Sequence, residues 1–285
     1  MGRLVLCPTP LGNLEDITQR TLRELRECDV IVVEDTRVTG ALLRHFGIDK
    51  PLRSLHERVE PARLREVRAL LEDGKTVAFA TDAGVPGISD PGGSLVRLAR
   101  EIGAAVDVLP GPSAFVGALV LSGFDIHQFR FDGFPPRKQA ERRAYLRTLA
   151  HEPAAIAWYE APSRVLDLLA DVAHVLPSRR VFAVREYTKK FEQHMLGDAL
   201  EVAKQIERPP RGEFALVLEG ISVTAQTHAD VSAEARAALL HLIESGTSVR
   251  SAVDAVALAS GAPRNALYKL AIARKRASVT GRASH

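Results

Sequence analysis

The sequence has little of what marks a disulfide-rich, metal-binding or membrane protein. Its only cysteines are Cys7 and Cys28, so a disulfide scaffold or a cysteine-based metal site is not expected. No apolar run approaches the ~20 residues that cross a bilayer. Residues 1–11 lack a basic start followed by a long apolar segment, so no signal peptide is expected. We therefore expect a cytoplasmic protein without a membrane partner.

Common nucleotide-binding motifs are missing too. An apolar run at residues 4–7 stops at a proline- and glycine-containing loop, and a helical pattern starts near Thr18. This order is typical of nucleotide-binding folds, yet neither G-x-G-x-x-G nor the full P-loop pattern G-x-x-x-x-G-K-[ST] occurs. No pair of histidines has metal-ligand spacing, so no metal is expected. What the first loop holds remains open at this point.

The composition otherwise indicates a globular protein with a polyanionic partner. The 285 residues suggest one large or two ordinary domains, with 46% apolar and 26% charged residues. The net charge is only +3, but basic residues crowd into residues 137–147 and 274–282. Either cluster alone could be a solvated helix face or a frayed terminus. Two clusters in one chain favour a partner such as nucleic acid.

Strand-like and helix-like segments alternate along most of the chain. This alternation predicts an α/β fold, with ligands outside the carboxyl ends of the strands. We expect strands at residues 4–7, 30–34, 76–80, 105–109, 154–159, 180–184 and 214–218. We expect helices at residues 18–26, 37–46, 61–72, 114–121 and 162–172.

A polar, aperiodic stretch near residues 222–229 predicts a linker. Three short helical patterns follow it, at 232–244, 248–259 and 264–273, and suggest a helix-turn-helix type unit. We therefore expect an N-terminal α/β domain, a second α/β domain, and a small helical domain with a basic tail. Their expected limits are 1–111, 112–222 and 230–285.

Four loops after expected strands are rich in glycine, proline and small polar residues. They are residues 8–13, 34–40, 81–93 and 110–114. Glycine lets the backbone approach a ligand, and proline lowers the cost of ordering the loop. The first, third and fourth contain no lysine, which disfavours a triphosphate and suits a nucleoside bearing a cation, such as S-adenosylmethionine. Residues 81–93 could be merely structural, but long ordered loops of this kind are usually functional.

Eight segments occur in an order that resembles one family. They are PTPLGNLEDIT, VVEDTRVTG, TDAGVPGISDPG, PGPSA, FDGFPPRK, YEAPSR, REYTKKFE and RGEFALVLEG. Together they resemble the ribosomal RNA small subunit methyltransferase I family, in the class III, tetrapyrrole-methylase-like group of S-adenosylmethionine-dependent methyltransferases. The resemblance covers about residues 4–220, and the C-terminal piece also resembles that family's helical domain.

The resemblance implies two α/β domains with S-adenosylmethionine in the cleft between them, usually in a homodimer. It implies methylation of the ribose 2′-hydroxyl of a cytidine in the decoding region of 16S rRNA, in the 30S subunit. A tetrapyrrole C-methyltransferase is the alternative, but that branch carries G-x-G-P-G-D where this chain has PTPLGN. A non-enzymatic RNA-binding protein on a decayed methylase fold is a third reading, disfavoured by the intact loops.

The resemblance also implies cofactor-binding positions in both α/β domains. These are Leu11, Asp82, Gly84, Val85, Ser113, Ala114, Tyr159, Ala161, Glu213, Phe214 and Ala215. Phe214 and Ala215 could instead be strand core, and Asp82 could cap its own loop.

The candidate catalytic residues lie in the strand-end loops and are Asp35, Arg37, Glu186 and Lys189. Because a ribose hydroxyl is a weak acid, a base or cation nearby should help its proton depart. Arg37 suits a phosphate, and Lys189 could stabilise an alkoxide, or act as base if burial lowers its pKa. Glu186 is the other candidate base. Asp35–Arg37 and Glu186–Lys189 could also be ion pairs that only shape loops.

The RNA contacts expected besides Arg37 are His56, Arg58, Arg137, Lys138, Arg142 and Arg143. The family commonly shows His-Glu-His-Asn where this chain reads HERV, so the second His and the Asn are missing here. Arg58 could substitute for them as a phosphate contact. The helical domain could grip rRNA or brace a dimer, and the sequence does not decide between them.

Overall fold

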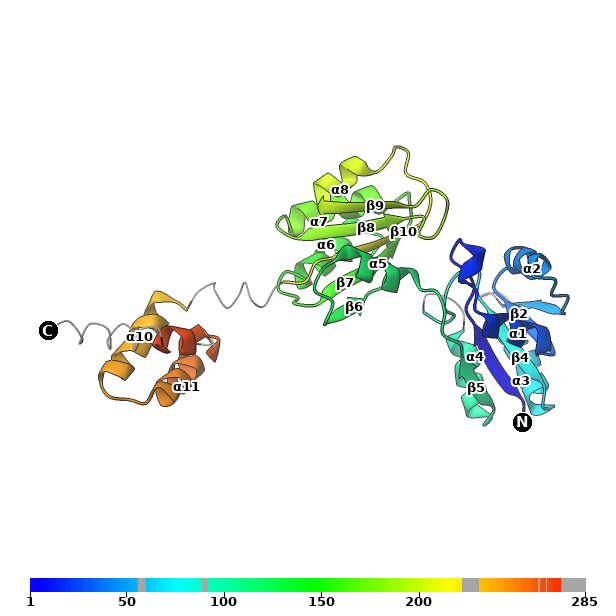
Figure 1. Ribbon diagram of the computed structural model, residues 1–285, viewed down its shortest axis with the longest axis horizontal. Coiled ribbons are helices and arrows are strands. Elements are labelled where there is room, and N and C mark those ends of the chain that lie inside the picture. The colour runs from blue at the N-terminus through cyan, green and yellow to red at the C-terminus, as the bar shows by residue number, and fades with distance from the viewer. Residues whose placement is uncertain (56–59, 89–91, 222–230, 261, 265, 273–285) are drawn as a thin grey trace. The chain divides into compact units, whose positions relative to one another are not determined.

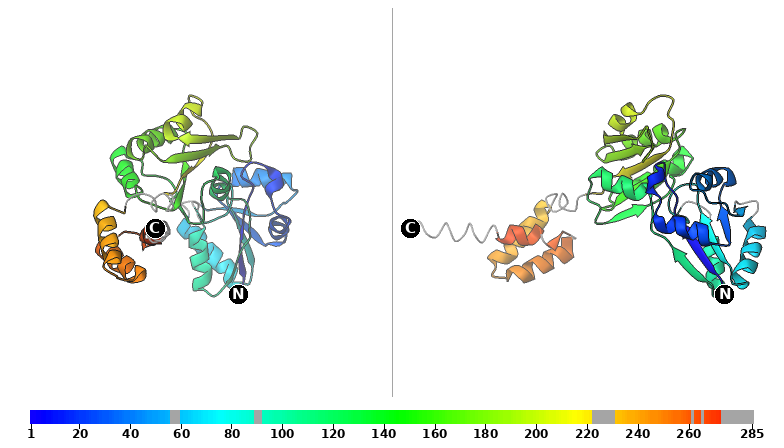
Figure 2. Two further views of the ribbon diagram at one scale, coloured as in Figure 1. Left: turned by 60° about the vertical axis from the view of Figure 1, so that its left-hand side comes forward. Right: turned by 45° about the vertical axis from the view of Figure 1, so that its right-hand side comes forward.

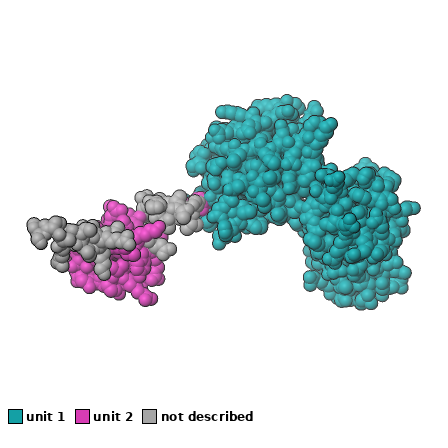
Figure 3. All heavy atoms as spheres, viewed as in Figure 1, with its two compact units in different colours: residues 1–220 teal, residues 221–285 magenta. Residues whose placement is uncertain are grey.

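The computed structural model describes residues 1–55, 60–88, 92–221, 231–260, 262–264 and 266–272. These residues form two compact units, residues 1–220 and 221–285, which are taken one at a time (Figure 3). Among the described helices, none combines the length and the apolar character that a membrane span requires. The predicted linker at 222–229 and the basic tail lie outside the described residues.

The first unit begins with a parallel sheet of five strands in the order β3-β2-β4-β1-β5 (Figure 1). The strands are β1 (Arg3–Cys7), β2 (Val30–Val33), β3 (Leu52–Ser54), β4 (Thr76–Ala80) and β5 (Ala105–Val108). Because the strands are parallel, their carboxyl ends and the loops that follow them meet at one edge of the sheet.

Helices cover both faces of this sheet (Figures 1 and 2). They are α1 (Gln19–Glu27), α2 (Thr36–His45), α3 (Glu60–Glu72) and α4 (Gly93–Glu101). Side chains alternate across a strand, so Leu4 packs in the core under α3 and α4 while Val5 packs in the core under α1 and α2. Strands buried on both faces read as continuous apolar runs, which is why β1 and β4 were predictable.

The same unit contains a second sheet of five strands in the order β6-β7-β10-β8-β9. They are β6 (Phe129–Phe131), β7 (Ala155–Glu160), β8 (Arg180–Arg185), β9 (Gln193–Asp198) and β10 (Phe214–Leu218). Only β6 and β7 are parallel, and the other pairs are antiparallel. The predicted α/β architecture is confirmed, while the boundary expected at residue 111 stays a prediction.

Helix α5 (Ala114–Ser122) packs on one face of the second sheet, against the core that contains Phe182 and Val217. The other face is covered by α6 (Gln139–Thr148), α7 (Val165–Val175) and α8 (Ala199–Gln205). Trp158 of β7 is fully buried in that second core.

The second unit is helical, as the sequence predicts. It contains α10 (Ala233–Glu244) and α11 (Val249–Ser260), and residues 266–272 are also helical. Ser232 caps α10 by accepting a hydrogen bond from the Ala235 amide. Leu239, Val253 and Leu267 form its small core.

Candidate functional site

The first and third strand-end loops are joined directly at the carboxyl edge of the first sheet. Thr9 and Gly84 exchange backbone hydrogen bonds of 3.1 and 3.0 Å, and the Thr81 hydroxyl donates to the Gly84 carbonyl. Gly84 has φ +81°, and a Cβ there would lie 3.2 Å from both Leu11 Cδ2 and the Pro112 carbonyl oxygen. Only glycine therefore fits where the first, third and fourth loops converge.

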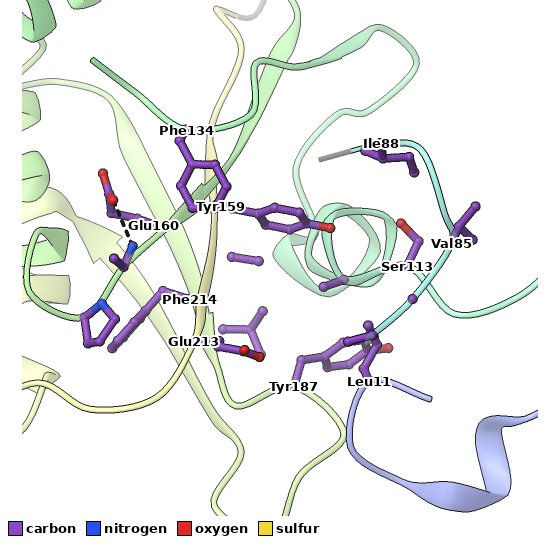
Figure 4. Close-up of a pocket in the computed structure, with 17 residues that line it drawn as sticks. Leu11, Val85, Ile88, Ser113, Phe134, Tyr159, Glu160, Tyr187, Glu213 and Phe214 are labelled. Atoms are coloured by element: carbon purple, nitrogen blue, oxygen red, sulfur yellow. Dashed lines mark hydrogen bonds between the residues drawn. The ribbon is translucent and has the colours of Figure 1, made fainter. Parts of the chain in front are cut away.

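These loops and the second sheet enclose a cavity of about 400 Å³ (Figure 4). That volume lies within the range of ~300–1,000 Å³ typical of small-molecule sites. The first sheet's loops and α5 contribute Leu11, Ala83, Gly84, Val85, Ile88, Ser113 and Ala114. The second sheet and its loops contribute Phe134, Tyr159, Glu160, Ala161, Pro162, Val184, Tyr187, Glu213, Phe214 and Ala215.

All of the predicted cofactor positions except Asp82 line this one cavity. Asp82 instead accepts hydrogen bonds from the Asp35 amide (3.2 Å) and the Thr39 hydroxyl (3.3 Å), and burial raises the pKa of its carboxyl. It therefore ties the third loop to the second and lies outside the cavity lining. Sequence reasoning missed Phe134 and Tyr187, although the motifs FDGFPPRK and REYTKKFE contain them.

The charged side chains that line the cavity are acidic, and each is paired with a basic residue outside the lining. The cavity's described lining includes the carboxylates Glu160 and Glu213 but no lysine or arginine. Glu160 is turned into the protein, where it accepts from the Ala161 amide at 2.8 Å and pairs with Arg164 at 3.1 Å (Figure 4). Glu213 is the carboxylate with the exposed side chain. The buried Ser113 Oγ has no hydrogen-bond partner among the described residues.

Asp35 and Arg37 form a local ion pair at the same edge. Asp35 caps α2 by accepting from the Arg37 amide at 2.8 Å, and its other oxygen lies 2.5 Å from Arg37 Nη2. The hydrogen bonds from Arg37 lower the pKa of the Asp35 carboxyl to about 2. The Arg37 side chain is 89% exposed, so the pair holds a guanidinium out toward solvent.

Lys189 lies between two carboxylates. Its Nζ donates to Glu186 Oε1 at 3.1 Å and to Glu213 Oε2 at 2.9 Å. Burial alone would lower the pKa of Lys189, but the hydrogen bonds and charges of Glu213 and Glu186 outweigh it and raise the pKa. The condition under which Lys189 could act as a base, a pKa lowered by burial, is not met here, because both neighbours favour its charged form.

Glu186 accepts hydrogen bonds from both Lys189 and the Glu213 amide. Burial would raise the pKa of its carboxyl, but the Glu213 amide, which donates at 2.9 Å, and Lys189 together lower it. Both Glu186 (φ 53°) and Thr188 (φ 65°) have backbone angles in the left-handed region, which residues other than glycine rarely adopt. Strain of this kind persists where surrounding structure fixes it, often at functional sites.

The turn at residues 186–189 is accommodated by three glycines from separate segments. A Cβ added to any of them would come closer than 3.0 Å to a side chain of the turn. Gly12 lies against Lys189, Gly117 against Tyr187, and Gly212 against Glu186. The first loop, α5 and the segment before β10 thus hold Tyr187 in the cavity wall and Lys189 beside its rim.

The basic cluster at residues 137–147 is only partly available to a partner. Arg142 is 3% exposed, and its Nε donates at 2.8 Å to Asp171, which is fully buried. Arg143 also donates to Asp171, at 2.6 Å, while Lys138 is exposed and pairs with a neighbouring glutamate. The expectation that Arg142 contacts RNA is corrected, because its guanidinium neutralises a buried carboxylate. The predicted contacts His56 and Arg58 lie outside the described residues.

Comparisons with known proteins identify the family. Residues 3–203 match the tetrapyrrole (corrin/porphyrin) methylases, and residues 229–275 match the RsmI C-terminal HTH domain. The chain is 44% identical over 221 residues to ribosomal RNA small subunit methyltransferase I of Thermotoga maritima, covering 77% of this chain and 99% of the relative. It is 40% identical to the Escherichia coli O157:H7 protein of the same name, covering 95% of each. This chain belongs to the ribosomal RNA small subunit methyltransferase I family.

Solved structures agree on the fold. The methyltransferase CobJ has a TM-score of 0.58 at 18% identity, covering 78% of this chain and 95% of its own. Uroporphyrin-III C-methyltransferase of Thermus thermophilus, complexed with S-adenyl homocysteine, has a TM-score of 0.52 at 20% identity and covers 79% and 100%. The family is one of S-adenosylmethionine-dependent methyltransferases, so the predicted cofactor is confirmed. The cavity fits that cofactor, since it offers apolar walls, a rim carboxylate and an unpaired buried hydroxyl.

Proposed function

We propose that the chain transfers a methyl group from S-adenosylmethionine to a ribose 2′-hydroxyl of 16S rRNA, at a cytidine of the decoding region. The observation that carries the proposal is the cavity, whose lining brings together all of the predicted cofactor positions except Asp82. The names of the relatives specify small subunit ribosomal RNA as substrate. A tetrapyrrole substrate is less well supported, because PTPLGN replaces the glycine-rich first loop of that branch.

We propose that the cofactor lies against Gly84, Val85, Ser113, Ala114 and Tyr159. When bound, S-adenosylmethionine supplies a methyl group already activated by its sulfonium. The absence of a side chain at Gly84 lets the first and fourth loops close around the site, and the Ser113 hydroxyl gains a hydrogen-bond partner from the ligand. Tyr159 packs edge to face with a neighbouring aromatic ring, which fixes an aromatic surface in the wall where a purine can stack.

The remaining site residues act on the ribose and its phosphates. Lys189, kept protonated by Glu186 and Glu213, stabilises negative charge on the ribose oxygen as its proton leaves. Glu186 positions this ammonium. Arg37, oriented by Asp35, presents a planar guanidinium that suits a phosphate of the RNA.

We also propose that the chain works as a homodimer. Helix α5 supports this proposal, since the side chains of Val116, Val120 and Leu121 are exposed on an apolar helix. Exposed apolar patches commonly mark contacts with another protein. Sedimentation equilibrium on the whole chain would give twice the monomer mass, and a monomer at micromolar concentration would contradict the proposal.

A methyl-transfer assay with three acceptors tests the function. The chain and S-adenosylmethionine with a tritiated methyl group are mixed with 30S subunits lacking the modification, naked 16S rRNA, or a precorrin-type tetrapyrrole. We expect label in the 30S subunit, at a decoding-region nucleotide that resists alkaline cleavage after its 2′-oxygen is methylated. Label only on the tetrapyrrole would overturn the proposal. No label at all, with the cofactor bound, would favour an RNA-binding protein that has lost its activity.

A further inference from the structure

A second hollow lies between α3 and α4, outside the cavity described above. It has a volume of about 370 Å³ and is lined by Leu64, Arg65, Arg68, Ser94, Arg97, Leu98 and Glu101. The two helices pack against each other on one face of the first sheet (Figure 1). Arginine is the commonest residue type in this lining, which we call the arginine hollow.

The arginine hollow has an excess of positive charge. Arg68 is held in place, because its Nη2 lies 2.8 Å from Glu101 and its Nη1 lies 3.7 Å from Glu72. Arg65 and Arg97 are exposed, and within the described part of the chain neither has a carboxylate oxygen within 4.0 Å. These two guanidinium groups are therefore available to an anion, beside a third that the glutamates fix.

A buried hydroxyl provides a second, independent indication of a ligand. Ser94 lines the hollow, and its buried Oγ has no hydrogen-bond partner among the described residues. Buried polar atoms in native proteins are nearly always paired. A phosphate oxygen in the hollow can accept from this hydroxyl once the serine side chain turns outward, while other oxygens of the phosphate accept from the planar forks of arginine.

The arginine hollow lies near the edge of the first sheet that carries the loops of the cavity. Both α3 and α4 begin after the carboxyl ends of strands, at the edge that also carries the cavity's loops. Arg65 is five residues after the first residue of α3, and Arg97 is four residues after the first residue of α4. Each arginine therefore lies about 6–8 Å along its helix from the helix N-terminus. Ile88, which lines the cavity, precedes α4 in the same connection. A strand that enters the cavity at this edge can therefore reach the arginine hollow.

We infer that the arginine hollow binds a backbone phosphate of the substrate RNA, near the nucleotide whose ribose enters the cavity. Arg65 and Arg97 grip the phosphate, Arg68 completes the positive wall, and Ser94 donates from its floor. The inference rests on the proposed function, since it takes RNA as the substrate.

The test compares two double variants that each remove two positive charges. Arg65→Gln/Arg97→Gln empties the hollow of its available charge. Arg26→Gln/Arg44→Gln is the matched control, because it removes exposed arginines from the last turns of α1 and α2, which pack on the other face of the first sheet. Binding to 30S subunits is measured over a range of salt concentrations, and KM and kcat are measured for methyl transfer.

The hollow variant should bind 30S subunits at least ~10-fold more weakly, with the slope of log affinity against log salt reduced by about 2. Its KM should rise while kcat and the affinity for S-adenosylhomocysteine stay unchanged, as for a lost binding contact. The control should change each quantity less than ~3-fold, since its charges lie outside the RNA path. Ser94→Ala, which alters no charge, should weaken binding a few-fold and leave the salt slope unchanged.

Equal losses in the two double variants would overturn the inference, because general attraction would then explain both. Unchanged binding in the hollow variant would overturn it too. A wild-type chain that binds 30S subunits but leaves them unmethylated would instead contradict the proposed function. The measurement of binding to 30S subunits tests the arginine hollow whether or not the chain methylates them.

Discussion

Adding one methyl group at Gly117 should reshape the cavity wall without touching a ligand. A Cβ at this position of α5 would lie 2.5, 2.6 and 2.7 Å from Cε1, Cζ and Oη of Tyr187. The Tyr187 ring lines the cavity (Figure 4) and is carried by a turn whose flanking residues, Glu186 and Thr188, have positive φ. Because that turn is fixed on both sides, the ring cannot move away without cost.

The effect of Gly117→Ala on the free energy of unfolding should change sign when the Tyr187 ring is removed. Alanine inside a helix is favoured over glycine by about 1 kcal/mol. Overpacking a well-filled site costs about 1–3 kcal/mol, and contact with three ring atoms places Gly117→Ala at the upper end. We therefore expect a net loss of about 1–2 kcal/mol in the wild type and a gain of about 1 kcal/mol in a Tyr187→Ala background. The coupling between the two positions should reach about 2–3 kcal/mol.

Urea unfolding followed by tryptophan fluorescence measures this coupling. The chain has a single tryptophan, Trp158, buried in the second sheet, so the signal reports the unit that contains the cavity. Calorimetry should show S-adenosylhomocysteine binding at least ~10-fold more weakly to Gly117→Ala than to the wild type, a loss of about 1.4 kcal/mol. The same sign of stability change in both backgrounds, or an unchanged affinity, would refute the reasoning.

Three further predictions follow from the charged groups. Lys189→Gln should lower kcat about 100-fold or more, while calorimetric affinity for S-adenosylhomocysteine stays the same, and equal losses in both would contradict its role. Asp171→Ala strands the buried charge of Arg142, so the free energy of unfolding in urea should fall by about 3–5 kcal/mol, and a loss under ~1 kcal/mol would count against the pair. The carboxyl of Asp35 should titrate by carbon NMR near pH 2, and in Arg37→Gln the midpoint should rise toward the usual ~3.9, though not fully, because the backbone amides of residues 37 and 38 still donate to it. Because the folded-state pKa of Asp35 lies below its unfolded value, the Asp35–Arg37 pair stabilises the fold above about pH 4, and this stabilisation is lost as the pH falls through about 2. A midpoint near pH 4 for Asp35 in the wild type would contradict the prediction.

The sequence predicts the central strands well because burial on both faces makes them continuous apolar runs. The short strand β3 was missed, since its three residues include an exposed arginine. Strand β9 was missed because only Met195 in it is buried, which leaves no clear alternation. Edge strands of this kind are specified by pairing with a neighbour rather than by their own composition.

The candidate site was predictable where motifs carry it, and not where distant residues decide it. Gly84 and Ser113 belong to loops whose composition alone indicates a ligand. The burial of Arg142 depends on Asp171, which lies on another helix, so a basic run in the sequence does not show it. The raised pKa of Lys189 likewise depends on Glu213, which the fold brings to it from another strand end.

A crystal structure of the chain with S-adenosylhomocysteine tests most directly whether the cavity holds the cofactor. We predict ligand density between Gly84, Ser113 and Tyr159, with the Ser113 hydroxyl paired to the ligand. Density at another site, or a cavity that stays empty at saturating ligand, would contradict the assignment.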